Sequence, residues 1–176
     1  MTKEEVYQLV CQTSIYVDSR HKTLVRLARV KEAYIYLYEF MTNVEDKHHV
    51  MASVLFEELI RFDLLKMTSI LDDFLMRLDT YANESTKRLI SKICRNIVYS
   101  KQLKLSKKQK QMLVGQALDW LVSDSKVATE AFAMDIIIRL KGEFAQEFTL
   151  AKGIVEKNYV SRSAAYQSKA KKLISA

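Results

Sequence analysis

Apolar side chains recur every three or four residues along almost the whole chain. This spacing places them on one face of an α-helix, where they can pack against a neighbouring helix. The pattern predicts ten helices, over residues 3–15, 19–30, 31–42, 47–60, 63–79, 84–101, 107–122, 125–141, 143–157 and 161–174. Proline is absent and only three glycines are present, so the residues that punctuate sheets and long loops are scarce. The sequence therefore predicts an all-α protein with short connections between its helices.

Polar residues that commonly begin helices precede several of these segments. Thr2 with Glu5, and Ser106 with Gln109, have the spacing of a capping box, in which two side chains each accept a backbone N–H. We expect single N-caps before four further helices, at Asp46, at Asn83 or Glu84, at Asp124 and at Ser161.

A small residue followed three positions later by a larger apolar one recurs on alternate helices. The pairs are Ala52/Leu55, Ser91/Cys94, Ala133/Ile136 and Ala170/Leu173, and their small residues are 39, 42 and 37 positions apart. A period near 40 with two helices in each unit is typical of HEAT and armadillo repeats. We therefore expect a right-handed α-α superhelix, a HEAT/armadillo-like solenoid of about ten helices, forming a single domain over residues 1–176.

Three segments resemble a known family. NESTKRLISKIC (83–94), ALDWLVSDSKVATEAFAM (117–134) and SRSAAYQSKAKKLI (161–174) are similar to short, all-helical bacterial proteins with a HEAT-like superhelix. The layout matches over nearly the whole chain, most clearly from about residue 83 onward. Members of that family are often labelled adenylosuccinate lyase, but this chain lacks proline and the Ser-, Gly-, Pro-, Lys- and Asn-rich signature loop of the lyases. The resemblance therefore implies a fold and no chemistry.

The net charge of +7 is concentrated in the middle of the chain. Residues 1–84 carry 10 basic and 14 acidic side chains, whereas residues 85–118 carry nine basic side chains and no acidic one. Such asymmetry indicates an anionic partner more strongly than a uniform excess would.

Within this basic stretch, Arg88, Lys92, Arg95 and Tyr99 fall on one face of the predicted helix 84–101. Cations along one line can follow a phosphate backbone. Further lysines, Lys107, Lys108 and Lys110, stand in the first turn of the next helix, where free N–H groups also favour an anion. We therefore expect an anion- or nucleic-acid-binding surface, the alternative being an ordinary solvated helix face.

The stretch AFAMDIIIRL (131–140) places two charges, Asp135 and Arg139, in an otherwise apolar helix. In the resembling family these positions are usually neutral. Residues four apart share a helix face, so we expect the two side chains to form an ion pair at the rim of the concave face. The pair is the only feature of this helix that suggests a function.

Trp120, Asp124 and Arg139 resemble the Trp, Asp and Arg that alkylpurine DNA glycosylases use on a superhelix of this kind. A carboxylate could stabilise a cationic sugar while the indole stacks beside it. The alternative is structural, because Trp120 lies on the apolar side of its helix and Asp124 stands where an N-cap belongs. No second tryptophan is present to complete an aromatic cage.

Other site chemistry finds little support in the sequence. His48 and His49 are adjacent and diverge on a helix, His21 stands alone, and Cys11 and Cys94 have no metal-ligand spacing, so we expect no metal site and two buried thiols. Neither a glycine-rich phosphate loop nor a nucleophile motif occurs, and we expect no cofactor. No apolar run approaches a membrane span and the first residues do not form a signal peptide, so we expect a cytoplasmic protein.

These observations favour a non-enzymatic module that binds or scaffolds macromolecules. Its expected partner is a protein or an anionic polymer such as nucleic acid, and a membrane is not expected. The alternative is a DNA glycosylase-like enzyme of the same fold, and lyase activity is not expected.

Overall fold

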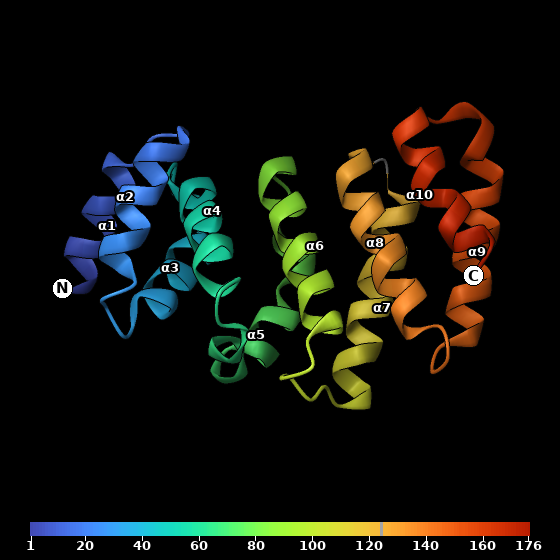
Figure 1. The fold of residues 1–176 in the computed structure, drawn as a ribbon, viewed down its shortest axis with the longest axis horizontal. Coiled ribbons are helices and arrows are strands. Elements are labelled where there is room, and N and C mark those ends of the chain that lie inside the picture. Colours follow the sequence, from blue (N-terminus) through green and yellow to red (C-terminus); the bar gives the residue numbers. More distant parts are fainter. Residues whose placement is uncertain (124) are drawn as a thin grey trace. The chain divides into compact units, whose positions relative to one another are not determined.

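The computed structural model describes residues 1–123 and 125–176, and every regular element within these ranges is helical (Figure 1). The α-helices are α1 (Lys3–Gln12), α2 (Val17–Leu27), α3 (Ala33–Thr42), α4 (His49–Ile60), α5 (Leu71–Met76), α6 (Glu84–Tyr99), α7 (Lys107–Val122), α8 (Val127–Leu140), α9 (Ala145–Asn158) and α10 (Ala164–Ile174). Three 3-10 helices, η1 (Leu64–Ser69), η2 (Leu78–Thr80) and η3 (Tyr159–Ser161), accompany them. The all-α prediction is therefore confirmed.

Contacts divide the chain into two compact units, residues 1–71 and 72–176. Each has a core of its own, which contains Leu37 and Phe56 in the N-terminal unit and Ile136 and Tyr166 in the C-terminal unit. The expectation of a single domain over the whole chain stays a prediction.

In the N-terminal unit, α3 packs along α4, and α1 contacts both of them. Val6 from α1, Leu37 from α3, and Leu55 and Phe56 from α4 are completely buried where these helices meet. The second helix, α2, packs against α1 and α4. It buries only Thr23 and Leu27, so most of its surface stays open. Among the α-helices of this unit, α2 therefore buries the fewest residues.

In the C-terminal unit, α8 lies between α6 and α10 and also packs against α7, while α9 contacts α7 and α10 (Figure 1). The small residues of the predicted repeat, Ser91, Ala133 and Ala170, have no exposed surface. The larger residues that follow each of them, Cys94, Ile136 and Leu173, are equally buried, as are Ala52 and Leu55 of α4. Side chains this small let neighbouring helix axes approach closely, while the larger ones fill the grooves between ridges.

Local hydrogen bonds explain where several helices begin. Both predicted capping boxes form, at Thr2 with Glu5 and at Ser106 with Gln109. Asn83 caps α6 by accepting the N–H groups of Ser85 and Thr86. The capping prediction for Asp124 concerns a residue outside the described ranges.

Two predicted caps are wrong. Ser163, and not Ser161, caps α10, because the chain first forms the short helix η3 and starts α10 afterwards. Asp46 precedes α4 without capping it, since His48 occupies the N-cap position and its side chain makes no capping bond. The Asp46 carboxylate instead accepts the Tyr7 hydroxyl at 2.6 Å and the His48 N–H at 2.7 Å. The Tyr7 hydroxyl first, and the His48 N–H second, lower the pKa of Asp46 below its ordinary value.

The predicted helix 63–79 is also wrong, because η1, α5 and η2 replace it. Its apolar residues Met67, Leu71, Phe74 and Leu78 are buried at helical spacing, which is why periodicity alone suggested one helix. At the end of η1, however, the backbone bonds over three residues, because the N–H of Ile70 donates to the carbonyl oxygen of Met67 at 3.1 Å. Bonds over three residues give the tighter 3-10 helix, which is normally short.

The two cysteines differ from each other. Cys94 is completely buried in α6, as expected, and burial raises the pKa of its thiol. Cys11 is only partly buried, contrary to the expectation of two buried thiols.

Replacing Ala133 by Leu tests the close packing of α8. The added carbons have no space in a fully closed contact, so we expect the free energy of unfolding to fall by about 1–3 kcal/mol. Urea unfolding followed by circular dichroism measures the change. Ala128→Leu is the matched control on the exposed side of the same helix and is expected to stay within about 0.5 kcal/mol of the wild type. Equal losses in the two variants would contradict close packing at Ala133.

Candidate anion-binding surface

The residues that the sequence singled out on α6 occupy its open face. Arg88 is exposed, Lys92 and Arg95 are partly exposed, and Tyr99 keeps 41% of its surface accessible. On the opposite side, Ile90, Ile93 and Ile97 are buried. The helix is therefore strongly amphipathic, with its cations on the face opposite the buried isoleucines.

Asp135 of α8 joins three helices through its carboxylate. Its Oδ2 atom accepts the Nε–H of Arg95 from α6 at 3.1 Å, and Lys169 from α10 donates to Oδ2 at 3.0 Å and to Oδ1 at 3.2 Å. The Asp135 side chain is only 12% exposed. One negative charge thus holds two positive ones, and the cluster keeps a net positive charge.

The predicted pair of Asp135 with Arg139 is replaced by this arrangement. Adjacent helices bring Arg95 and Lys169 to the carboxylate, whereas the Nε–H of Arg139 is directed at the carbonyl oxygen of Val98, 3.4 Å away. Arg139 has no carboxylate partner within the described ranges. The expected position of Asp135 and Arg139 at the rim of a concave face stays a prediction.

Tyr99 lies between two guanidinium groups. The Cζ atom of Arg95 is 4.9 Å from the centre of the tyrosine ring, and that of Arg139 is 5.6 Å from it. The aromatic ring attracts both cations through its quadrupole, which favours their close approach without neutralising either charge. The Tyr99 hydroxyl is directed at the carbonyl oxygen of Asp135, 3.4 Å away. These contacts keep positive charge concentrated at the junction of α6 and α8.

A polar pocket of about 410 Å³ adjoins Arg139, between the end of α6, the segment that follows it, α7 and the end of α8. Ser100, Lys104, Lys110 and Glu143 contribute polar groups to its lining. Lys110 and Glu143 form an ion pair at 2.7 Å. Lys104 and Arg139 have no acidic partner in the part of the chain that the structure describes. The pocket therefore retains two uncompensated cations.

The first turn of α7 differs from the expected anion site. Lys107 and Lys108 are exposed, but Lys110 is engaged by Glu143. The capping box occupies the N–H of Gln109, which accordingly is not free to bind an anion. The cations at the junction of α6 and α8 therefore form the better candidate site.

Sequence reasoning missed Lys169 of α10, although it contacts Asp135 directly. Arg95 and Lys169 lie 40 and 34 residues from Asp135 along the chain. These intervals are near the 37 to 42 residues that separate the small residues of alternate helices, and this spacing was the sequence signal that could have identified the partners.

Glu130 of α8, which is almost fully buried, also finds its partner on another segment of the chain. Arg162, 32 residues away, donates to its Oε2 atom. The guanidinium of Arg162 also lies over the ring of Tyr166. This second acid–base contact joins the segment before α10 to α8.

The glycosylase-like set does not form a site in the described structure. Trp120 is only 3% exposed within the core, so its indole cannot stack on a base from solution. Arg139 is exposed and directed toward Val98 and Tyr99. Asp124 lies outside the described residues. No observation therefore favours the glycosylase alternative.

Residues 1–123 and 125–176 contain no group of three or more His, Cys, Asp and Glu side chains placed to hold a metal ion. None of their helices has both the length and the apolar character needed to span a bilayer.

Comparisons with family models, with curated proteins and with solved structures find no match for this chain. Any function assigned to it must therefore follow from the geometry and charge of its own residues.

Replacing Asp135 by Ala tests its role in holding the cluster together. Arg95 and Lys169 would lose their shared counterion close to a third cation, so we expect the protein to be destabilised. The expected loss is about 1–3 kcal/mol, less than for a fully buried pair because both cations remain about one third exposed. Urea unfolding measures it, with Asp119→Ala on the exposed surface of α7 as the control. A loss no larger than that of the control would show that Asp135 does not tie the helices together.

Proposed function

We propose that the chain is a HEAT/armadillo-like repeat protein that binds macromolecules without catalysing a reaction. The alternate helices α6, α8 and α10 lie next to one another, and each buries a small residue at a repeat interval near 40. Repeat proteins of this kind present extended surfaces to their partners. The burial of Ser91, Ala133 and Ala170 supports the repeat part of the proposal.

The surface formed by α6 and α8 has an anionic polymer as its proposed ligand, with nucleic acid as the first candidate. The observation that carries this proposal is the pair of guanidinium groups around Tyr99, of which Arg139 has no acidic partner in the described ranges. Stability alone would favour an acid beside Arg139, because neutralising it would reduce repulsion from Arg95. An uncompensated cation on a partly apolar helix is therefore better explained by a ligand than by folding.

The positions of the other cations support an extended ligand. Arg88 precedes the Tyr99 cluster by three helical turns on the same open face, and Lys104 lines the adjoining pocket. A phosphate backbone carries regularly spaced negative charges that a row of cations can follow. A single small anion would engage only one part of this row.

Fluorescence anisotropy with labelled single-stranded and duplex oligonucleotides tests the proposal. We expect binding at about 50 mM salt and, for about four phosphate contacts on a duplex, an affinity roughly a hundredfold lower at about 200 mM. Arg88→Ala and Arg139→Ala should each weaken binding. Each should also reduce the magnitude of the slope of log K against log salt by about one, as expected for the loss of one phosphate contact. Lys157→Ala, at the far end of α9, is the control and should change neither quantity.

Labelled heparin provides a polyanion without bases. If heparin and oligonucleotides bind with equal affinity, the ligand is a polyanion in general. Tighter binding of the oligonucleotides would support nucleic acid. Absence of binding at low salt, or binding that ignores salt, would contradict the proposal and leave a protein partner as the better explanation.

A further inference from the structure

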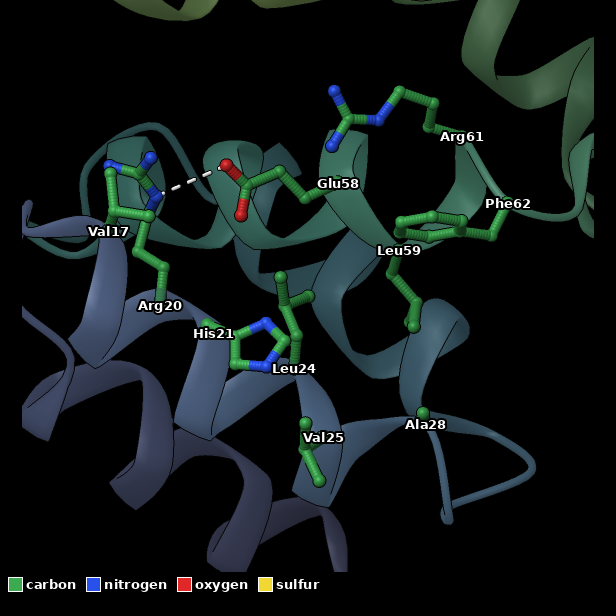
Figure 2. A pocket seen from close by; sticks show the side chains of 10 residues that line it. All are labelled: Val17, Arg20, His21, Leu24, Val25, Ala28, Glu58, Leu59, Arg61 and Phe62. Carbon is green, nitrogen blue, oxygen red and sulfur yellow. Dashed lines mark hydrogen bonds and ion pairs between the residues drawn. The ribbon is translucent and has the colours of Figure 1, made fainter.

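A groove of about 320 Å³ lies between α2 and α4 of the N-terminal unit (Figure 2). Leu24, Val25 and Ala28 line it from the α2 side, and Leu59 and Phe62 line it from the α4 side. The groove is thus largely apolar, although it opens to solvent. Its residues belong to the N-terminal unit, whereas the basic surface proposed to bind an anionic polymer is formed by α6 and α8 of the C-terminal unit.

The apolar walls are more exposed than folding requires. Phe62 is 81% exposed, Val17 is 70% exposed and Val25 is 45% exposed. The core of this unit is supplied by other residues of the same helices, such as Leu27, Phe56 and Ile60. Contiguous exposed apolar side chains mark surfaces that contact another molecule, and large aromatic ones often contribute most of the binding energy.

An ion pair closes one end of the groove and joins its two walls. Arg20 of α2 donates through Nε to Oε1 of Glu58 on α4 at 3.1 Å (Figure 2). Its terminal nitrogen also donates to the carbonyl oxygen of Ile15. The pair links α2 to α4, and the apolar floor of the groove, formed by Leu24, Val25, Ala28, Leu59 and Phe62, stays open to solvent. A preformed groove costs a ligand little reorganisation.

The charged residues that line the groove leave a net positive charge. They are Arg20, Glu58 and Arg61, and Arg20 and Glu58 pair with each other. The α2 wall belongs to a positively charged segment, because residues 17–29 carry four basic side chains and one acidic one. Arg61 adds a cation on the opposite wall, with its guanidinium 5.5 Å from the centre of the Phe62 ring. No acidic side chain in the described ranges contacts Arg61, and the Glu58 carboxylate is already engaged by Arg20.

We propose that this groove binds an amphipathic helix of a partner protein whose apolar stripe is flanked by acidic residues. The groove has space for roughly two or three aliphatic side chains, such as a helix presents at positions i, i+3 or i+4, and i+7. Acidic residues beside this stripe would meet Arg61, the cation of the lining that is not paired with Glu58, which gives charge complementarity.

A second copy of this chain fits the groove less well. A symmetric dimer uses the same patch on both subunits, so it would bring the two basic α2 helices together. Like charges across an interface oppose association. The charge distribution therefore favours a different, acidic partner.

A displayed peptide library tests the proposal on the complete chain. The peptides have about 18 residues, or five helical turns, with Leu fixed along one stripe and the remaining positions drawn from Glu, Lys, Gln and Ala. We expect the enriched peptides to be rich in Glu and not to be enriched on the Phe62→Ala variant. Because Phe62 is almost fully exposed, this substitution should leave the fold intact.

The most enriched peptide is then labelled and measured by anisotropy. Phe62→Ala and Arg61→Glu should each weaken its binding about tenfold or more. Val160→Ala, which shortens a similarly exposed apolar side chain in the C-terminal unit, is the matched control and should leave the affinity unchanged.

Three outcomes would overturn the proposal. Enrichment of Lys-rich or uncharged peptides would refute the acidic partner. If the wild-type chain enriches no peptide more strongly than the Phe62→Ala variant does, the groove is not a docking site. Sedimentation equilibrium showing a dimer of the chain that Phe62→Ala dissociates would assign the groove to a second copy. Oligonucleotide binding by the basic surface is measured separately, so failure of either proposal is distinguishable from failure of the other.

Discussion

Close contact between helices at small side chains is the constraint on which the C-terminal unit depends. Ser91, Ala133 and Ala170 are completely buried on three successive alternate helices, and a larger residue at any of them would separate helix axes. Because α8 contacts α6, α7, α9 and α10, its position determines where the side chains of α6 and α10 meet. The distance between helices thus controls the charged contacts as well as the core.

The Asp135 cluster illustrates this dependence. A carboxylate on α8 reaches Arg95 and Lys169 only because the helices on both sides of it are close. Because Arg95 and Lys169 occupy this carboxylate, Arg139 instead contacts the ring of Tyr99 and the carbonyl oxygen of Val98. The same arrangement therefore stabilises the junction of three helices and leaves one cation available to a ligand.

The sequence predicted helices well because their signals are local. Apolar periodicity and capping residues such as Ser106 with Gln109 act within a few positions of each other. The segment 63–79 was predicted wrongly because its buried residues keep helical spacing across the breaks that separate η1, α5 and η2. The amphipathic face of α6 was likewise predictable, but the partners of Asp135 were not, since they come from other helices. The spacing of four residues identified Arg139 as a possible partner of Asp135. Tertiary packing instead brings Arg95 and Lys169 to its carboxylate.

The two candidate surfaces differ in what surrounds their cations. Residues 1–71 carry nine basic and ten acidic side chains, a net charge of −1, and residues 72–176 carry nineteen and eleven, a net charge of +8. Net charge alone would therefore assign every anionic partner to the C-terminal unit. At the α2–α4 groove, however, cations border an apolar floor, so a ligand must supply apolar and acidic groups together. Beside Arg139 the pocket is polar, so a ligand can bind through charge alone. The surroundings of each cation, more than the number of cations, therefore determine the class of partner that each surface suits.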